Sequence, residues 1–156
     1  MRLTLEQVIE RHGKSVYMAA YSLLKNREDA EDVLQDTLLR YHLSRQDFAS
    51  EQHLRAWLLR LAINRAKDLL KAARRRDTAL TEDVAELAFP QPESRRVFEA
   101  VLALPEAYRI VVHLHYYEDY SVKEIAAALR LSQAAVKTRL SRAREMLRLN
   151  LGDSDN

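Results

Sequence analysis

Residues 121–140 read SVKEIAAALRLSQAAVKTRL, and this stretch predicts two short helices joined by a tight turn. Ser121 and Glu124 have the spacing of a capping box, in which each side chain accepts the other residue's backbone amide proton at a helix start. Apolar residues then recur at the spacing that packs two helices across a turn, at Ile125, Leu129, Leu131, Val136 and Leu140. The second helix begins at Ser132 and is basic. This pattern is typical of a helix-turn-helix whose second helix enters the major groove of DNA, and the alternative is an ordinary helical hairpin with a solvated charged face.

The composition favours an all-α protein. Only two glycines and three prolines occur among 156 residues, whereas helix-forming residues are plentiful. Because the chain has no cysteine, a disulfide framework and a cysteine-ligated zinc site are excluded, and a reducing compartment fits. No apolar run approaches the roughly 20 residues that span a bilayer, and the N-terminus has no apolar signal core. We therefore expect a soluble, cytoplasmic protein.

The uneven distribution of charge predicts two modules. Residues 1–76 hold 15 basic and 10 acidic side chains, and residues 95–149 hold 10 basic and six acidic ones. Between them, residues 77–94 hold five acids and no base, together with Pro90 and Pro92. Closely spaced prolines exclude a regular helix, because each lacks an amide proton and restricts the residue before it. We expect two small helical domains joined by a flexible acidic linker, with the boundaries 1–76, 77–94 and 95–151.

Apolar spacing predicts the helices of both modules. In the N-terminal module the first helix has a break at Gly13 and the third is long, with approximate bounds Leu5–Lys25, Arg27–Tyr41 and His53–Arg76. The polar stretch 43–52 between the last two carries one exposed-looking aromatic, Phe48. In the C-terminal module we expect helices at 93–104, 105–118, 121–129 and 132–150. The linker holds at most one turn of helix, at Glu82–Leu87.

The third predicted helix carries a cationic stripe. Steps of three and four residues place five polar side chains on one face, at Arg60, Asn64, Lys67, Lys71 and Arg74, and Arg75 extends the charge. Such a face suits a phosphate backbone with one or two base contacts, although basic residues in a last turn also complement the helix dipole. Among the neighbouring aromatics, Trp57 fits the apolar face of the helix, so Phe48 is the better candidate for touching a base.

The second predicted helix has an acidic face, which indicates either a basic protein partner or simple solvation. No catalytic constellation accompanies it. His113 and His115, two apart on a helix, point to different faces and do not share a metal easily, and no Gly-rich phosphate loop or nucleophile elbow occurs. We expect neither an enzyme nor a cofactor.

Three strings of the sequence carry a family resemblance. They are DAEDVLQDT at 29–37, RAWLLRLAINRAKDLLKAARRR at 55–76 and LPEAYRIVVHLHYYEDYSVKEIAAALRLSQAAVKTRLSRAREML at 104–147. Their order and the total length resemble the bacterial RNA polymerase sigma factors of the extracytoplasmic-function (ECF) class. The resemblance implies a protein that binds core RNA polymerase and directs it to promoters, with residues 1–76 as sigma region 2 and residues 95–151 as region 4.

The resemblance also implies a role for individual residues. The implied partners on the polymerase are its β′ clamp helices and its β flap. The residues implied to contact the polymerase are Asp29, Glu31, Asp32, Gln35 and Asp36. The residues implied to bind the −10 promoter element are Phe48, Arg60, Asn64, Lys67, Lys71, Arg74 and Arg75. The loop at 43–52 is implied to hold a base flipped out of that element. The residues implied to bind the −35 element are Ser132, Gln133, Ala134, Lys137, Thr138, Arg139, Arg142 and Arg144. An anti-sigma protein is a further partner that the family makes plausible.

Two departures from the family pattern concern single residues. Arg130 stands in the turn where glycine is usual, and a left-handed backbone there costs on the order of 1 kcal/mol for another residue. Lys71 stands where arginine is frequent, so the charge is kept but the planar fork is lost. Two rival functions stay open: a free-standing helix-turn-helix regulator, which would bind duplex DNA alone, and a sigma-like decoy that occupies an anti-sigma protein.

Overall fold

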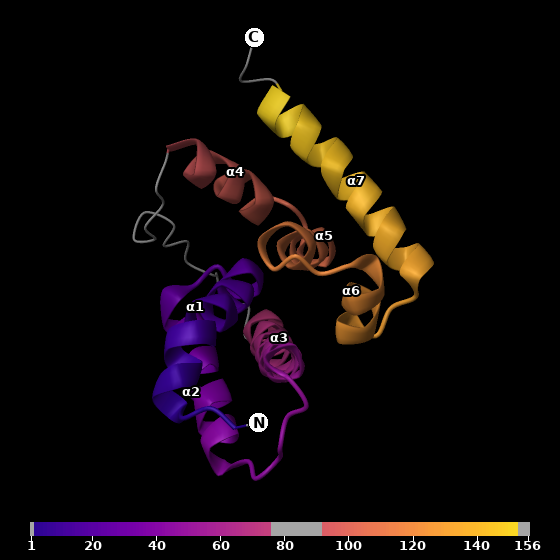
Figure 1. Cartoon of the computed structure of the whole chain (residues 1–156). Helices are drawn as coiled ribbons and strands as arrows, with labels where there is room; N and C mark the ends of the chain where they lie inside the picture. The colour runs from indigo at the N-terminus through magenta and orange to yellow at the C-terminus, as the bar shows by residue number, and fades with distance from the viewer. Residues whose placement is uncertain (1, 76–91, 153–156) are drawn as a thin grey trace. The chain divides into compact units, whose positions relative to one another are not determined.

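A computed structural model describes residues 2–75, with side chains as far as residue 73, and residues 92–152 (Figure 1). Helices joined by short turns and loops make up both ranges, and neither contains a strand, so the all-α prediction is confirmed. The chain divides into two compact units, Met1–Glu82 and Asp83–Asn156. The acidic stretch at 77–91 and the helical turn expected at Glu82–Leu87 lie outside the described residues.

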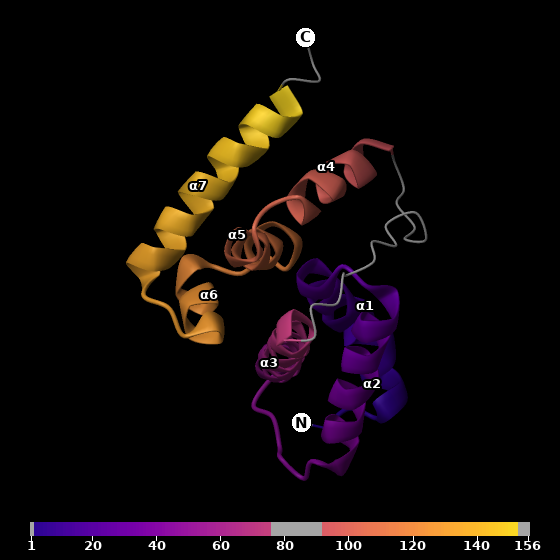
Figure 2. The same ribbon diagram turned by 180° about the vertical axis from the view of Figure 1, so that it is seen from behind.

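Three helices form the N-terminal unit: α1 (Leu5–Leu24), α2 (Arg27–Leu43) and α3 (Glu51–Arg75). Each packs against both of the others, as the views from the front and from behind agree (Figures 1 and 2). Thr4 and Gln7 form a capping box at the start of α1, and Asn26 caps α2 by accepting the amide proton of Asp29 at 2.9 Å. The fully buried apolar side chains of the core include Val16, Leu23, Val33, Leu58 and Ile63.

The break expected at Gly13 is wrong, because α1 is continuous through it. Gly13 is buried, and a Cβ atom added there would meet only Ile9 Cγ2, at 3.8 Å, which is an ordinary van der Waals contact. A glycine inside a helix costs about 1 kcal/mol relative to alanine, and the packing of α1 on its neighbours outweighs this cost.

The C-terminal unit contains α4 (Pro92–Leu102), α5 (Glu106–Val112), the π-helical turn η2 (His113–Tyr117), α6 (Val122–Leu129) and α7 (Gln133–Gly152). α4 begins at Pro92, so the linker expected to reach residue 94 extends three residues too far. Proline is favourable at the first position of a helix, where its missing amide proton has no partner to lose. α7 contacts α4, α5 and α6 and therefore holds this unit together.

The helix-turn-helix is formed by α6, α7 and the turn between them. Both bonds of the predicted capping box are present, at 2.9 Å to the Ser121 amide and 3.1 Å to the Glu124 amide. Arg130 adopts the left-handed conformation, with φ 58° and ψ 46°, and the next amide, of Leu131, donates to Ala126 O at 3.0 Å to close the helix end. Ser132 then accepts the amide proton of Ala135 at 3.0 Å and caps α7.

Candidate nucleic-acid interface

The cationic stripe of α3 lies on the surface of the N-terminal unit. Arg60, Asn64 and Lys71 are exposed and Lys67 is half-buried, while Leu54 and Leu58 on the other side of the helix are fully buried. Among the described residues, neither Arg60 nor Lys71 forms an ion pair. Arg74 and Arg75 lie on the last turn of α3, and their side chains are outside the description. The exposed part of the stripe presents two cations and an amide between them.

Phe48 does not lie on the surface. It is 1% exposed and packs against three rings, those of Tyr41, His53 and Trp57, at centroid distances of 6.1, 5.3 and 5.3 Å. The interpretation of Phe48 as an exposed aromatic that touches a base is therefore wrong. The polar residues around it suggested exposure, but a single large apolar side chain in a polar loop is the one that fastens the loop to the core.

Trp57, expected in the core, is only half-buried. It lies three residues before Arg60 and seven before Asn64, so it shares the side of α3 that bears the stripe. The aromatic ring beside the cations is thus that of Trp57, and the spacing along the helix was the signal that could have identified it.

The loop at residues 44–50 connects α2 to α3 and is held by hydrogen bonds at both ends. Ser44 Oγ accepts the amide proton of Gln46 at 3.1 Å, and His53 Nδ1 accepts that of Ala49 at 3.1 Å. Ser50 Oγ in turn accepts the His53 amide proton at 3.1 Å and caps α3. The side chains that remain exposed toward solvent are those of Arg45, Gln46, Asp47, Ala49 and Ser50.

The acidic face of α2 is partly engaged by basic side chains of the same unit. Glu31 lies 3.8 Å from Arg27, Asp36 lies 3.1 Å from Arg40, and Asp32 lies 3.6 Å from Arg65 of α3. These pairs are exposed or half-exposed, and pairs of that kind contribute at most about 1 kcal/mol, so a basic partner can replace them. Of the two other predicted residues, Gln35 is exposed and Asp29 is half-buried.

Two leucines that the sequence reasoning missed extend this face. Leu39 is 54% exposed and Leu43 is 69% exposed. They follow at three- and four-residue steps from the acidic residues and lie opposite the buried stripe of Ala30, Val33, Thr37 and Tyr41. We call the combined face the α2 strip; its members are Asp32, Gln35, Asp36, Leu39 and Leu43. It offers apolar area and negative charge together.

α7 presents a second polar face, on the C-terminal unit. Most of the predicted residues lie in solvent, on Ser132 and the first three turns of α7, namely Ser132, Gln133, Ala134, Lys137, Thr138 and Arg142. Arg139 is half-buried beside the core stripe of Val136, Leu140 and Ala143. The face that would enter a groove of DNA is therefore narrower than the predicted set.

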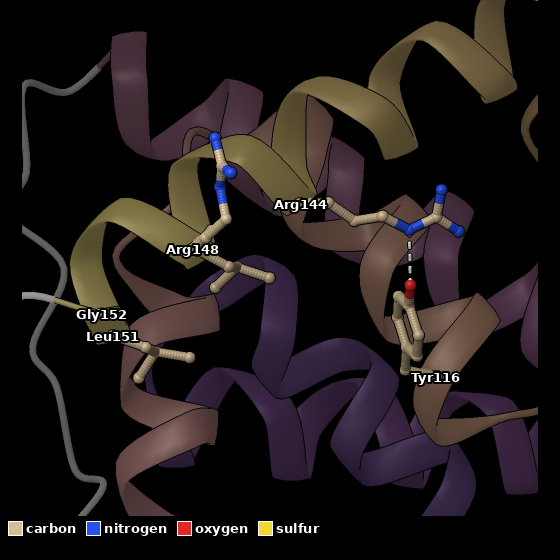
Figure 3. Close-up of a pocket in the computed structure, with 6 residues that line it drawn as sticks. Tyr116, Arg144, Arg148, Leu151 and Gly152 are labelled. Carbon is tan, nitrogen blue, oxygen red and sulfur yellow. Dashed lines mark hydrogen bonds between the residues drawn. The ribbon is translucent and has the colours of Figure 1, made fainter. Parts of the chain in front are cut away.

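Arg144 is exposed but is held by an aromatic ring. Its Nε donates to the Tyr116 hydroxyl at 2.6 Å, and its guanidinium carbon lies 5.7 Å from the centre of the Tyr116 ring (Figure 3). This pair forms one wall of an open groove of about 380 Å³ at the C-terminal half of α7, lined also by Leu147, Arg148, Leu151 and Gly152. The lining is mostly apolar. No sequence reasoning identified the groove, because one of its lining residues, Tyr116, comes from η2 and the others come from α7.

A buried histidine lies in η2. His113 Nε2 is 3.6 Å from Glu118 Oε1, and its ring stacks on Tyr117 at 5.3 Å. Burial raises the pKa of the Tyr117 hydroxyl. Nowhere in the described ranges do three or more histidine, cysteine or acidic residues gather as a metal site would require.

The comparisons with known proteins agree for both units. The family model Sigma-70 region 2 matches residues 8–76, and the model Sigma-70, region 4 matches residues 94–147. The chain is 32% identical over 154 residues to the ECF RNA polymerase sigma factor SigM of Mycobacterium tuberculosis, with 97% of this chain and 79% of that protein covered.

Solved structures give the same result. In a complex of CnrH with the cytosolic domain of CnrY, the matched chain is 33% identical with a TM-score of 0.66, covering 97% of this chain and 89% of that one. The sigma factor RpoE of Bartonella quintana, solved with the anti-sigma factor NepR, shares the fold with a TM-score of 0.76 at 24% identity, covering 94% and 96% of the two chains. No helix within residues 2–75 or 92–152 has both the length and the apolar character of a bilayer span.

Proposed function

Because the chain belongs to the ECF class of bacterial RNA polymerase sigma factors, which bind core polymerase and direct promoter-specific transcription initiation, we propose a division of that task among its surfaces. The observation that carries it is the pair of exposed polar faces, one on α3 and one on α7, in two separately folded units. The protein acts in the cytoplasm and catalyses no reaction of its own.

The −10 element contacts α3 and the loop at 44–50. Arg60 and Lys71 neutralise phosphates, and the amide of Asn64 between them is placed to bond a base edge. A base flipped from the strand would be held by the loop, whose exposed side chains and backbone offer donors and acceptors. Trp57 is the ring available for stacking, in place of Phe48.

The −35 element contacts the N-terminal half of α7. Gln133 and Lys137 lie one turn apart on its exposed face, with Thr138 beside them, and Arg142 lies one further turn along, where it meets the phosphate backbone. Arg144 is assigned to the wall of the groove instead of to DNA, because Tyr116 holds its guanidinium. Arg139 has a supporting role.

Core polymerase contacts the α2 strip, through its β′ clamp helices. The mixed acidic and apolar surface fits a basic, amphipathic partner, and the exposed leucines supply the apolar area on which such contacts depend. On the C-terminal unit, the apolar groove is the site for the β flap. The groove begins at Arg144, just beyond Arg142, the last residue assigned to DNA, and runs to Gly152, so DNA and the flap would occupy successive parts of α7.

An anti-sigma protein is the proposed regulator. Its support is the relative CnrH, which was solved with the cytosolic domain of CnrY and is 33% identical to this chain. The domain boundaries that we propose are 1–76 for region 2 and 92–152 for region 4.

Run-off transcription on a library of genomic fragments tests the function. Core polymerase given this protein should start at discrete promoters that core polymerase alone does not use. No gain over the core enzyme would contradict the proposal, and tight binding to duplex DNA without polymerase would favour a free-standing regulator. Binding to an anti-sigma protein alone, without polymerase or promoter, would identify a decoy.

The α2 strip is tested with Leu39→Ser. We expect this change to weaken binding to core polymerase by about tenfold or more, because an apolar side chain is lost from the interface, and to leave the thermal unfolding midpoint nearly unchanged. The matched control is Ile9→Ser, since Ile9 is also a large apolar residue of this unit and is 47% exposed, but lies on α1. Equal affinity of both variants for core polymerase would place the interface elsewhere.

A further inference from the structure

The N-terminal arm, residues 2–4, crosses the end of α2 and reaches the loop at 44–50. The guanidinium of Arg2 donates to Tyr41 O at 3.0 Å and, more weakly, to Gln46 O at 3.4 Å. Its central carbon lies 4.3 Å from the centre of the Tyr41 ring. The Tyr41 hydroxyl donates in return to Leu3 O, and Leu3 is buried. A single side chain thus connects the helix end, an aromatic ring and the loop.

The chemistry of arginine suits this position. Tyr41 O belongs to the last turn of α2, where it also accepts the amide proton of Ser44 at 3.1 Å and where the helix dipole favours a cation. Gln46 O belongs to the loop two residues beyond the Ser44 cap. A planar guanidinium with several donors can bond two carbonyls at once, whereas a lysine ammonium is a point charge on a flexible stem. The contact therefore restricts the distance between the helix end and the loop.

The loop is fastened a second time, just beyond Gln46. Phe48 is buried and stacks on the face of the same tyrosine, Tyr41, with the ring planes 28° apart. Gln46 and Asp47 therefore lie between two anchors, the Arg2 bond and the Phe48 ring, and both of their side chains are exposed. Fixing the backbone on either side limits the orientations that these side chains can adopt.

We propose that Arg2 is a positioning residue for promoter reading, which fixes the path of the loop so that Gln46 and Asp47 meet a −10 base in one defined pose. The inference rests on the proposed role of this loop. It differs from a direct role of Arg2 on the DNA backbone, because both of its bonds are to carbonyl groups of the protein and its ring contact is to Tyr41.

The test uses the full chain with core polymerase and a promoter library randomised over the −10 element. Arg2→Ala should lower the preference for the best base at one −10 position by about five- to tenfold and leave the other positions and the affinity for core polymerase unchanged. Arg2→Lys, which keeps the charge and loses the fork, should recover only part of that preference. The matched control is Lys14→Ala, which removes one exposed cation from α1 and should leave the base profile as in the unaltered protein.

Tyr41→Phe provides a second variant, since it removes the bond to Leu3 O but keeps the ring. It should shift the preference in the same direction by a smaller factor. A base profile of Arg2→Ala identical to that of the unaltered protein would overturn the inference. So would a uniform loss at all sequences with a shallower salt dependence, which is the sign of a lost phosphate contact. If the unaltered protein itself shows no −10 preference, the proposed role of the loop fails first.

Discussion

The two surfaces assigned to DNA are built in different ways. On α7, the exposed residues follow from helical spacing alone, since Val136, Leu140 and Ala143 fill the core and the other side is left for solvent. The exposed residues of the loop at 44–50 do not follow from helical spacing, because the shape of the loop depends on contacts of Phe48, Tyr41 and Arg2. Arg2 lies 44 residues from its bonding partner Gln46. Local structure determines which side chains of the helix are exposed, whereas contacts between residues distant in sequence determine which side chains of this loop are exposed.

The largest expected effect is that of Phe48→Ala, which would break the support of the loop. Removing a fully buried phenylalanine costs about 3–5 kcal/mol in the free energy of unfolding, because transfer energy is lost and a cavity is left among three rings. Denaturant unfolding of the whole chain measures it, and Phe48→Leu, which keeps most of the volume, should lose far less. An unchanged stability with lost promoter activity would restore the interpretation of Phe48 as a base contact.

The next largest effect concerns α7, where we expect promoter binding to weaken without a loss of stability. Gln133→Ala should weaken promoter binding by the holoenzyme by about 1–3 kcal/mol, with the loss concentrated at one −35 position, while the unfolding midpoint stays the same. Asn150→Ala is the control, because Asn150 is equally exposed at the other end of the helix. If Gln133→Ala lowers stability and binding together, then the exposed face of α7 also contributes to the packing of the C-terminal unit.

The smallest effect tests whether the stability of the N-terminal unit can change without a change in promoter preference. Gly13→Ala should stabilise the N-terminal unit by about 0.5–1 kcal/mol, because alanine fits the helix and the added methyl meets only Ile9 Cγ2 at 3.8 Å. Promoter preference should not change, since α1 has no part in the loop at that point. Gly152→Ala, at the end of α7 with no neighbour within 4 Å, is the control and should change little. A loss of stability in Gly13→Ala would show that the core has no room for the methyl.

The difference between the two surfaces also explains what the sequence could predict. The capping box at Ser121 follows from residues within four positions of one another and is confirmed. The exposure of most predicted residues of α7 follows from helical spacing in the same way, with Arg139 as the half-buried exception. The exposed cations of α3 follow from the same helical spacing.

Features that depend on packing between distant segments were missed or misjudged. The prediction that Phe48 is exposed was wrong, because the local sequence of a polar loop does not determine whether its apolar side chain packs into the core. Arg2 was not singled out at all, since its partners Tyr41 and Gln46 are far along the chain. Leu39 and Leu43 were missed because helical spacing marks a face but does not show whether another helix covers it.

The central place of α7 among α4, α5 and α6 has a consequence for hydrogen exchange. Amide protons near Val136 and Leu140 should exchange only when the whole C-terminal unit opens, whereas those near Leu149, which is 57% exposed, should exchange by fraying of the helix end. The half of α7 that we propose for DNA contact should therefore keep its shape in the free protein. Its protection factors should change little when DNA binds, whereas those of the groove half should rise when a protein partner covers it.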